Sequence, residues 1–207
     1  MYHLNRATPL LAAFTVAGFL VATAAQAAVV NGTFDTLVPS NGTGGGWTSS
    51  NVDVNGGWKS TGGNPGTGPF FILNDSGGGT DPTILQVLTG LTSGATYHAS
   101  GDFRHVYNSV ALGPIQAFGV AIDGVFLFEA PGTGNPNWLS FGFDFVPAAN
   151  SVTLSFAGER NGTDVDFGID NISVIAAIPE PSTYALMLAG LGFVGFVASR
   201  RRKALAA

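Results

Sequence analysis

The stretch FGVAIDG, residues Phe118–Gly124, decides the fold class of this 207-residue chain. Its apolar residues alternate with small or polar ones, and this period of two is typical of a β-strand with one buried face. Asp123-Gly124 then separates the run from a second apolar run, a pattern that favours a type I′ hairpin turn. Phe141–Phe145 and Ser151–Phe156 show the same alternation.

Further strands are expected where short apolar runs lie between Gly-, Asn- and Pro-rich turns. Segment 40–68 is mostly Gly, Ser, Thr and Asn, and we expect one long loop there, or loops around one short strand. The domain contains no amphipathic helix of useful length, so the sequence predicts an all-β fold, a jelly-roll β-sandwich. The other expected strands are Val29–Phe34, Phe70–Leu73, Ile84–Leu88, Tyr97–Phe103 and Asp166–Val174.

The last of these strands changes its side-chain parity. Phe167 and Ile169 share one parity, whereas Ile172 and Val174 share the other. A β-bulge at Asp170-Asn171 would turn both pairs toward the core and would also re-aim the Asp170 side chain.

Both ends of the chain are apolar. Residues 1–27 have the pattern of a secretory signal peptide, a signal helix that ends at the small-x-small site Ala25-Gln26-Ala27, with an uncleaved anchor as the alternative. Residues 183–199 predict a short transmembrane helix, and the four cations that follow would keep the bulk of the chain outside the cytoplasm. A buried helix is disfavoured because this run has no polar face. One β-domain, residues 28–177, remains between the ends.

Charge and cysteine content limit the partners of this domain. Residues 28–177 carry three cationic side chains against twelve carboxylates, a balance of −9, and the chain has no cysteine. Because phosphate recognition needs Lys and Arg, we expect no nucleic acid to bind. Without disulfides, the core or a bound ion must stabilise the fold.

The C-terminal segment 178–203 has three parts in a fixed order. Pro179-Glu180-Pro181 comes first, the apolar run follows, and an Arg-rich end completes it. This arrangement resembles the PEP-CTERM sorting tail of Gram-negative bacteria. The resemblance implies recognition by an exosortase-type membrane enzyme, an inner-membrane precursor and a final location at the cell surface or in an exopolysaccharide (biofilm) matrix. The positions that carry it are Pro179, Glu180, Pro181, Arg200, Arg201 and Arg202.

Three stretches of the domain carry a second resemblance. VVNGTFD (29–35), ILQVLTGLTSGATYHASGDF (84–103) and FGIDNISV (167–174) are similar to galactose-binding-like jelly rolls, the fold of many carbohydrate-binding modules. In that group a structural calcium ion often lies between the first loop and the last strand. The resemblance implies ligands at the Thr33 carbonyl, Asp35 and Asp170, although the family often has Glu where this chain has Asp35. Calcium prefers six to eight oxygen ligands, so further carbonyls or water would be needed.

Aromatic side chains are the candidate contacts for a polysaccharide. Rings stack on the apolar faces of pyranoses, and Trp47, Trp58 and Trp138 lie among Gly, Asn and Pro, where we expect loops. Tyr107 is a further candidate. The alternative is that these rings cap the sandwich core.

No catalytic motif is present in the sequence. The chain has neither G-x-S-x-G nor H-E-x-x-H, and nothing in it brings Glu129 and Glu159 together as a glycosidase pair. We therefore predict a protein that is not an enzyme. It is either a module that binds extracellular polysaccharide or a structural matrix protein without a specific ligand.

Overall fold

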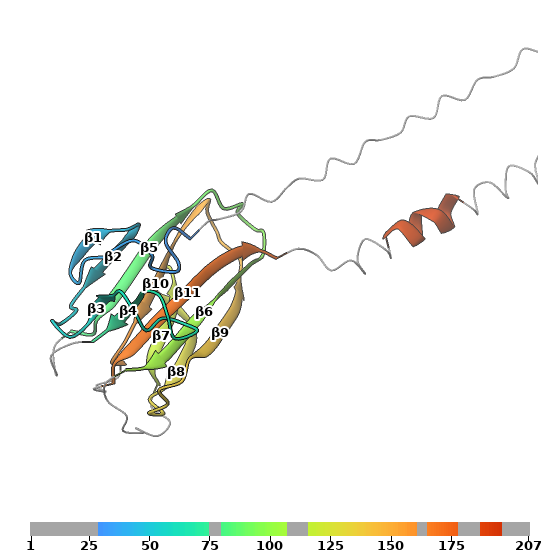
Figure 1. The fold of residues 1–207 in the computed structure, drawn as a ribbon. Coiled ribbons are helices and arrows are strands. Elements are labelled where there is room, and N and C mark those ends of the chain that lie inside the picture. The colour runs from blue at the N-terminus through green and yellow to red at the C-terminus, as the bar shows by residue number, and fades with distance from the viewer. Residues whose placement is uncertain (1–28, 75–79, 107–115, 161–164, 178–186, 196–207) are drawn as a thin grey trace, which may run out of the picture.

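The computed structural model describes residues 29–74, 80–106, 116–160, 165–177 and 187–195. The first four ranges form two antiparallel sheets, which pack face to face (Figure 1). The six-stranded sheet has the order β1-β2-β5-β10-β7-β8, and the five-stranded sheet has the order β3-β4-β11-β6-β9. The all-β jelly-roll sandwich is therefore confirmed.

The strand bounds agree closely with the periodic patterns. They are β1 Gly42–Gly44, β2 Trp47–Ser50, β3 Gly57–Lys59, β4 Phe70–Leu73, β5 Thr83–Thr89, β6 Tyr97–His105, β7 Gln116–Ile122, β8 Val125–Pro131, β9 Leu139–Phe145, β10 Ser151–Ala157 and β11 Phe167–Ala176.

The predicted hairpin joins β7 and β8. Ile122 pairs with Val125, and Asp123 and Gly124 have φ angles of 49° and 79°. Two successive positive φ angles are the signature of a type I′ turn, whose twist matches that of the flanking strands.

The predicted bulge in β11 is also present. The register against β6 shifts between Asp170 and Ser173, and Asn171 has a φ of 52°. Side chains on both sides of the shift reach the core, since Ile169 is 0% and Ile172 is 5% exposed. The extra residue turns Asp170 and Asn171 toward the outer face of the five-stranded sheet.

Two expectations about the strands are wrong. Val29–Phe34 is a turn and not a strand, because Asn31 and Phe34 have positive φ angles and the Gln86 side chain takes the place of a partner strand. The Gln86 amide accepts a bond from the Val30 N–H and donates one to the Val30 carbonyl, at 2.8 and 2.9 Å. Segment 40–68 holds three short strands, β1, β2 and β3, and not one.

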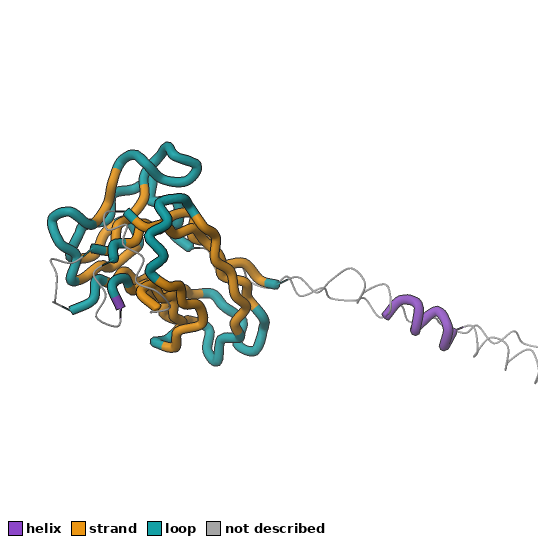
Figure 2. The backbone as a smooth tube through the Cα atoms, turned by 90° about the horizontal axis from the view of Figure 1, so that it is seen from below, coloured by secondary structure: helices purple, strands orange, loops and turns teal. Residues whose placement is uncertain are grey.

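The predicted terminal segments lie largely outside the described residues. Residues 1–27, the Pro179-Glu180-Pro181 triplet and Arg200–Arg202 are among those not described. Residues 187–195 form a helix whose residues are all exposed (Figure 2). Within the described part of the chain, no helix is long and apolar enough to cross a membrane.

Candidate functional site

The outer face of the five-stranded sheet carries a hydrogen-bonded group of polar side chains. Asp102 on β6 accepts bonds from Asn64 Nδ2, Ser140 Oγ and Asn171 Nδ2, at 2.7, 2.7 and 2.8 Å. These donors come from the β3–β4 loop, from β9 and from the bulge in β11. We call Asn64, Asp102, Ser140, Asp170 and Asn171 the amide–carboxylate cluster.

The β3–β4 loop, residues 60–69, reaches across this face and is attached to it through Asn64 (Figure 1). The Asn64 N–H donates to Asp170 Oδ2 at 2.8 Å. Gly63 makes this close approach possible, because a Cβ atom there would lie 2.5 Å from Asp170 Oδ2 and 2.4 Å from the Pro69 carbonyl oxygen.

Asp170 is a buried carboxylate with an altered proton affinity. It is 3% exposed, and its second oxygen accepts a bond of 2.7 Å from the Asn171 N–H. Burial raises the pKa of Asp170 from 3.8 to about 6, and the nearby charges of Asp102 and Asp35 act in the same direction. The two backbone N–H bonds lower the pKa but do not offset the loss of solvation.

Next to the cluster, one guanidinium lies against two aromatic rings. Arg104 Cζ is 4.9 Å from the centre of the Phe70 ring and 4.8 Å from that of Trp138. The two rings meet edge to face, with centroids 5.7 Å apart. Such cation–π contacts fix the orientation of a planar side chain. Trp138 Nε1 is buried and has no hydrogen-bond partner among the described residues.

The predicted aromatic contacts separate into different environments. Trp47 is 0% exposed on β2, stacks on Phe34 and donates from Nε1 to the Asn31 carbonyl at 3.0 Å. Its expected loop position is wrong, because its ring fills the core between the sheets. Trp58 lies on β3 and not on the expected loop, where it is part-buried, packs against the core and donates to the Phe34 carbonyl. Tyr107 lies outside the described residues.

Trp138 is the predicted aromatic that joins the outer face. It precedes β9, is partly exposed and contacts Phe70 and Arg104. Four residues of this face were not predicted from the sequence, namely Asn64, Asp102, Arg104 and Ser140. The sequence of β6 contained a signal for two of them. Its alternation places Asp102 and Arg104 on the face opposite the buried Ala99 and Phe103.

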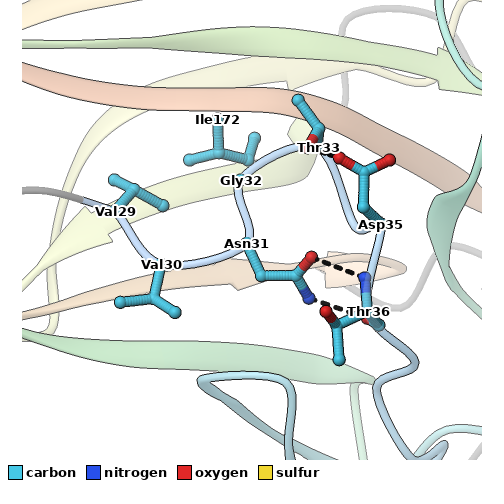
Figure 3. Close-up of a pocket in the computed structure, with 8 residues that line it drawn as sticks. All are labelled: Val29, Val30, Asn31, Gly32, Thr33, Asp35, Thr36 and Ile172. Atoms are coloured by element: carbon cyan, nitrogen blue, oxygen red, sulfur yellow. Dashed lines mark hydrogen bonds between the residues drawn. The ribbon is translucent and has the colours of Figure 1, made fainter.

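Two of the three predicted calcium ligands, Thr33 and Asp35, lie at the N-terminal turn, and the third, Asp170, lies in the bulge of β11. Thr33 donates from its hydroxyl to Asp35 Oδ2 at 2.6 Å, and both line an open hollow of about 530 Å³ beside Ile172 (Figure 3). Asp35 lies close enough to Asp170 to raise its pKa. The described residues hold no group of three acidic, His or Cys side chains positioned for a metal. The carboxylate chemistry suits calcium, but carbonyl or water oxygens would have to complete the shell.

Glu129 and Glu159, the two carboxylates considered as a glycosidase pair, lie in different environments. Glu129 forms an ion pair with Arg160, and Glu159 is 2% exposed. His105 is buried against Phe167 and accepts a bond from the Gly134 N–H at 2.7 Å, and its burial lowers its pKa. These contacts are structural.

Comparison with known proteins gives one motif and a set of fold relatives. Residues 177–203 match the PEP-CTERM protein-sorting motif, and the chain therefore carries that motif. No curated protein matches the chain. Among solved structures, the chain is similar to a protein of Bacteroides thetaiotaomicron assigned as a sugar binding protein, with a TM-score of 0.55 and 12% identity over 73% of this chain and 100% of that one.

The chain is also similar to two other solved structures. A Stig cyclase from Fischerella sp. TAU has a TM-score of 0.54 and 14% identity over 76% of this chain and 100% of that one. The CBM22-1 xylan-binding domain of Paenibacillus barcinonensis Xyn10C has a TM-score of 0.49 and 13% identity over 75% and 100%. At such identities the likeness establishes the fold, and function must be argued from the site.

Proposed function

We propose that this protein is exported and binds an extracellular polysaccharide through the outer face of its five-stranded sheet. The observation that carries the proposal is the position of Trp138. Its ring contacts Phe70 and Arg104 on the same outer face that carries the amide–carboxylate cluster. Sugar recognition needs an apolar surface for the ring and fixed donors and acceptors for the hydroxyls, and this face offers both within one patch.

Each component of the face has a part in this proposal. The Trp138 ring supplies a surface for stacking, and its buried Nε1 lacks a partner among the described residues. Ser140 is exposed and Asn64 is half-buried, so both can exchange hydrogen bonds with a ligand at the edge of the cluster. Asp102 holds both in place through bonds of 2.7 Å, which limits the entropy that binding would cost.

The test is a binding titration with paired tryptophan variants of the full chain. The chain is purified in a detergent without sugar headgroups, and the host's exopolysaccharide is added while tryptophan fluorescence is followed. Trp138→Ala is expected to weaken binding by at least about tenfold, because a buried aromatic contact contributes more than about 1.4 kcal/mol. Trp58→Phe, which changes a ring packed against the core, is the matched control and should leave affinity unchanged. Equal effects of the two changes would contradict the proposal.

The export route follows from the sorting motif. A PEP-CTERM motif implies exosortase-dependent sorting, and we propose an inner-membrane precursor that is then released to the cell surface or matrix of a Gram-negative bacterium. Deletion of the exosortase in the host should leave the chain in the inner-membrane fraction. An unchanged distribution would argue against this route.

We also propose that calcium stabilises the N-terminal turn through Thr33, Asp35 and Asp170. The support is electrostatic, because carboxylates that raise a neighbour's pKa are relieved by a cation. Calcium should raise the unfolding temperature of the full chain, chelator should reverse the rise, and Asp35→Asn should abolish it. Asp144→Asn changes an exposed carboxylate on another strand. If it also abolished the rise in unfolding temperature, the effect of calcium would be a nonspecific charge effect.

The second candidate function is a structural matrix protein without a ligand. It is favoured by low charge and high glycine content, with 10% charged residues and 30 glycines in the chain. A folded chain that gives no saturable signal with any polysaccharide but self-associates at matrix concentrations would support it.

A further inference from the structure

The outer face of the six-stranded sheet holds a second hollow, on the side of the sandwich away from the amide–carboxylate cluster. Its volume is about 530 Å³, within the range of small-ligand sites. The lining combines one aromatic ring, one amide, two hydroxyls, one carboxylate and one guanidinium. These residues are Asn51, Thr80, Asp81, Thr83, Phe126, Ala157 and Arg160, and we call this site the Phe126 hollow.

An aromatic ring and a guanidinium form the wall of the hollow. Phe126 on β8 is 39% exposed, and Arg160 Cζ lies 3.5 Å from the centre of its ring. Arg160 in turn forms an ion pair with Glu129 on the same strand as Phe126. The guanidinium is therefore held between a ring and a carboxylate, and these contacts fix the position of the ring.

Gly119 on β7 makes room for this arrangement. A Cβ atom at this position would lie 2.6 Å from Phe126 Cδ1 and 2.7 Å from Arg160 Nη1. Any side chain there would displace the ring, the guanidinium or both. The backbone thus lets the pair lie directly on the sheet.

The polar lining comes from the end of the same sheet. Thr83 on β5 exchanges a hydroxyl bond of 2.8 Å with Ser50 on β2 and pairs with Ala157 across the sheet. Asn51 and Thr80 are exposed at the ends of the adjoining loops. Hydroxyl and amide groups of this kind both donate and accept, as recognition of a polyhydroxylated ligand requires.

The charges of the hollow select against anionic ligands. Glu129 neutralises Arg160, and Asp81 adds a negative charge, so the hollow carries no net positive charge. An anionic sugar or phosphate would meet repulsion from Asp81. A neutral sugar has an apolar ring face for Phe126 and hydroxyls for the polar lining.

We propose that the Phe126 hollow is a second carbohydrate-binding site, which takes a neutral sugar unit. The two sites lie on opposite sheets of one sandwich, so one chain with both would bridge two polysaccharide strands. The second site goes beyond the proposed function and can bind whether or not the Trp138 face does.

The test measures binding stoichiometry of the full chain in a detergent without sugar headgroups. The probes are neutral hexasaccharides, namely xylohexaose, cellohexaose and laminarihexaose, titrated by calorimetry. We expect Phe126→Ala to remove one binding event or to weaken it at least about tenfold. Phe126→Tyr keeps the ring and should retain binding. Leu127→Ala, an exposed apolar change on the same strand, is the matched control.

A second variant tests whether the loss of binding in Phe126→Ala comes from the lost ring or from misfolding. Gly119→Ala keeps every lining side chain but displaces the ring and the guanidinium, and it should reproduce the loss seen in Phe126→Ala with the unfolding temperature little changed. The second site is supported if Phe126→Ala and Gly119→Ala lose hexasaccharide binding at the hollow. The Trp138→Ala chain must at the same time keep its binding at the hollow. If only Trp138→Ala removes binding, or if no hexasaccharide binds, the second site is overturned. If only Phe126→Ala removes binding, the second site stands and the Trp138 face is overturned as the proposed site.

Discussion

Asn64 and Asp102, which are 38 residues apart in the chain, are joined by a hydrogen bond of 2.7 Å from Asn64 Nδ2 to Asp102 Oδ2. The bond attaches the β3–β4 loop to β6 of the five-stranded sheet. The backbone N–H of the same Asn64 is bonded to Asp170. One loop residue therefore connects β6 with the bulge of β11, and the shape of the proposed binding face depends on it.

Asn64→Ala should release this loop without unfolding the sandwich. The variant loses a hydrogen bond to a charged group, which contributes about 1.5–3 kcal/mol, so the free energy of unfolding should fall by about that amount. Hydrogen exchange in residues 60–69 should accelerate more than in β10. Asn150→Ala, at an exposed turn before β10, is the control. Unchanged exchange in 60–69 would show that the loop does not depend on Asn64.

Asn171 has two functions in the bulge, because its side chain bonds Asp102 and its backbone adopts a positive φ. Asn171→Gly and Asn171→Ala should separate these two functions. Both lose the bond from Asn171 Nδ2 to Asp102, but only glycine adopts the φ of 52° without strain. The alanine variant should therefore be less stable than the glycine variant by about 1–2 kcal/mol in denaturant unfolding. Equal stabilities would mean that the bulge relaxes in the variants.

Trp47→Ala should affect stability and not recognition. The ring is fully buried, so its removal should lower the free energy of unfolding by about 3–5 kcal/mol. At a temperature where the variant is still folded, its polysaccharide affinity should equal that of the wild type. A specific loss of affinity in the folded variant would contradict the assignment of Trp47 to the core.

The raised pKa of Asp170 predicts a pH dependence of stability. A carboxyl group whose pKa is higher in the folded than in the unfolded state stabilises the fold below pH 3.8, and this contribution is lost as the pH rises through about 6. In chelator, the free energy of unfolding should therefore decline across this interval. Asp35→Asn removes one of the charges that raise the pKa and should make the decline smaller.

The control for this titration is Asp144→Asn, whose carboxylate is paired with His98 at 2.7 Å on the same sheet face. The part of the decline that Asp35→Asn removes and Asp144→Asn keeps is assigned to Asp170. If calcium binds as proposed, adding it should lower the pKa of Asp170 and reduce the decline in the wild type but not in Asp35→Asn. A pH-independent stability in chelator would refute the raised pKa.

Local sequence patterns determined many of the strands and turns of this protein. Alternation at a period of two predicted β7, β9 and β10, Asp123-Gly124 predicted the hairpin, and the parity change predicted the bulge at Asp170-Asn171. These features follow from nearest neighbours in the chain, since strand faces and turn angles depend on a few adjacent residues. The PEP-CTERM motif is also a property of contiguous sequence.

Tertiary structure decided which aromatic and polar residues share a surface. Trp47 and Trp138 have similar Gly- and Asn-rich neighbours in sequence, yet one fills the core and the other lies beside the amide–carboxylate cluster. Asn64 and Asp170 meet although 106 residues separate them. Strand register and loop path set such contacts, and each arises from packing across the whole sandwich. No local pattern in the chain encodes them.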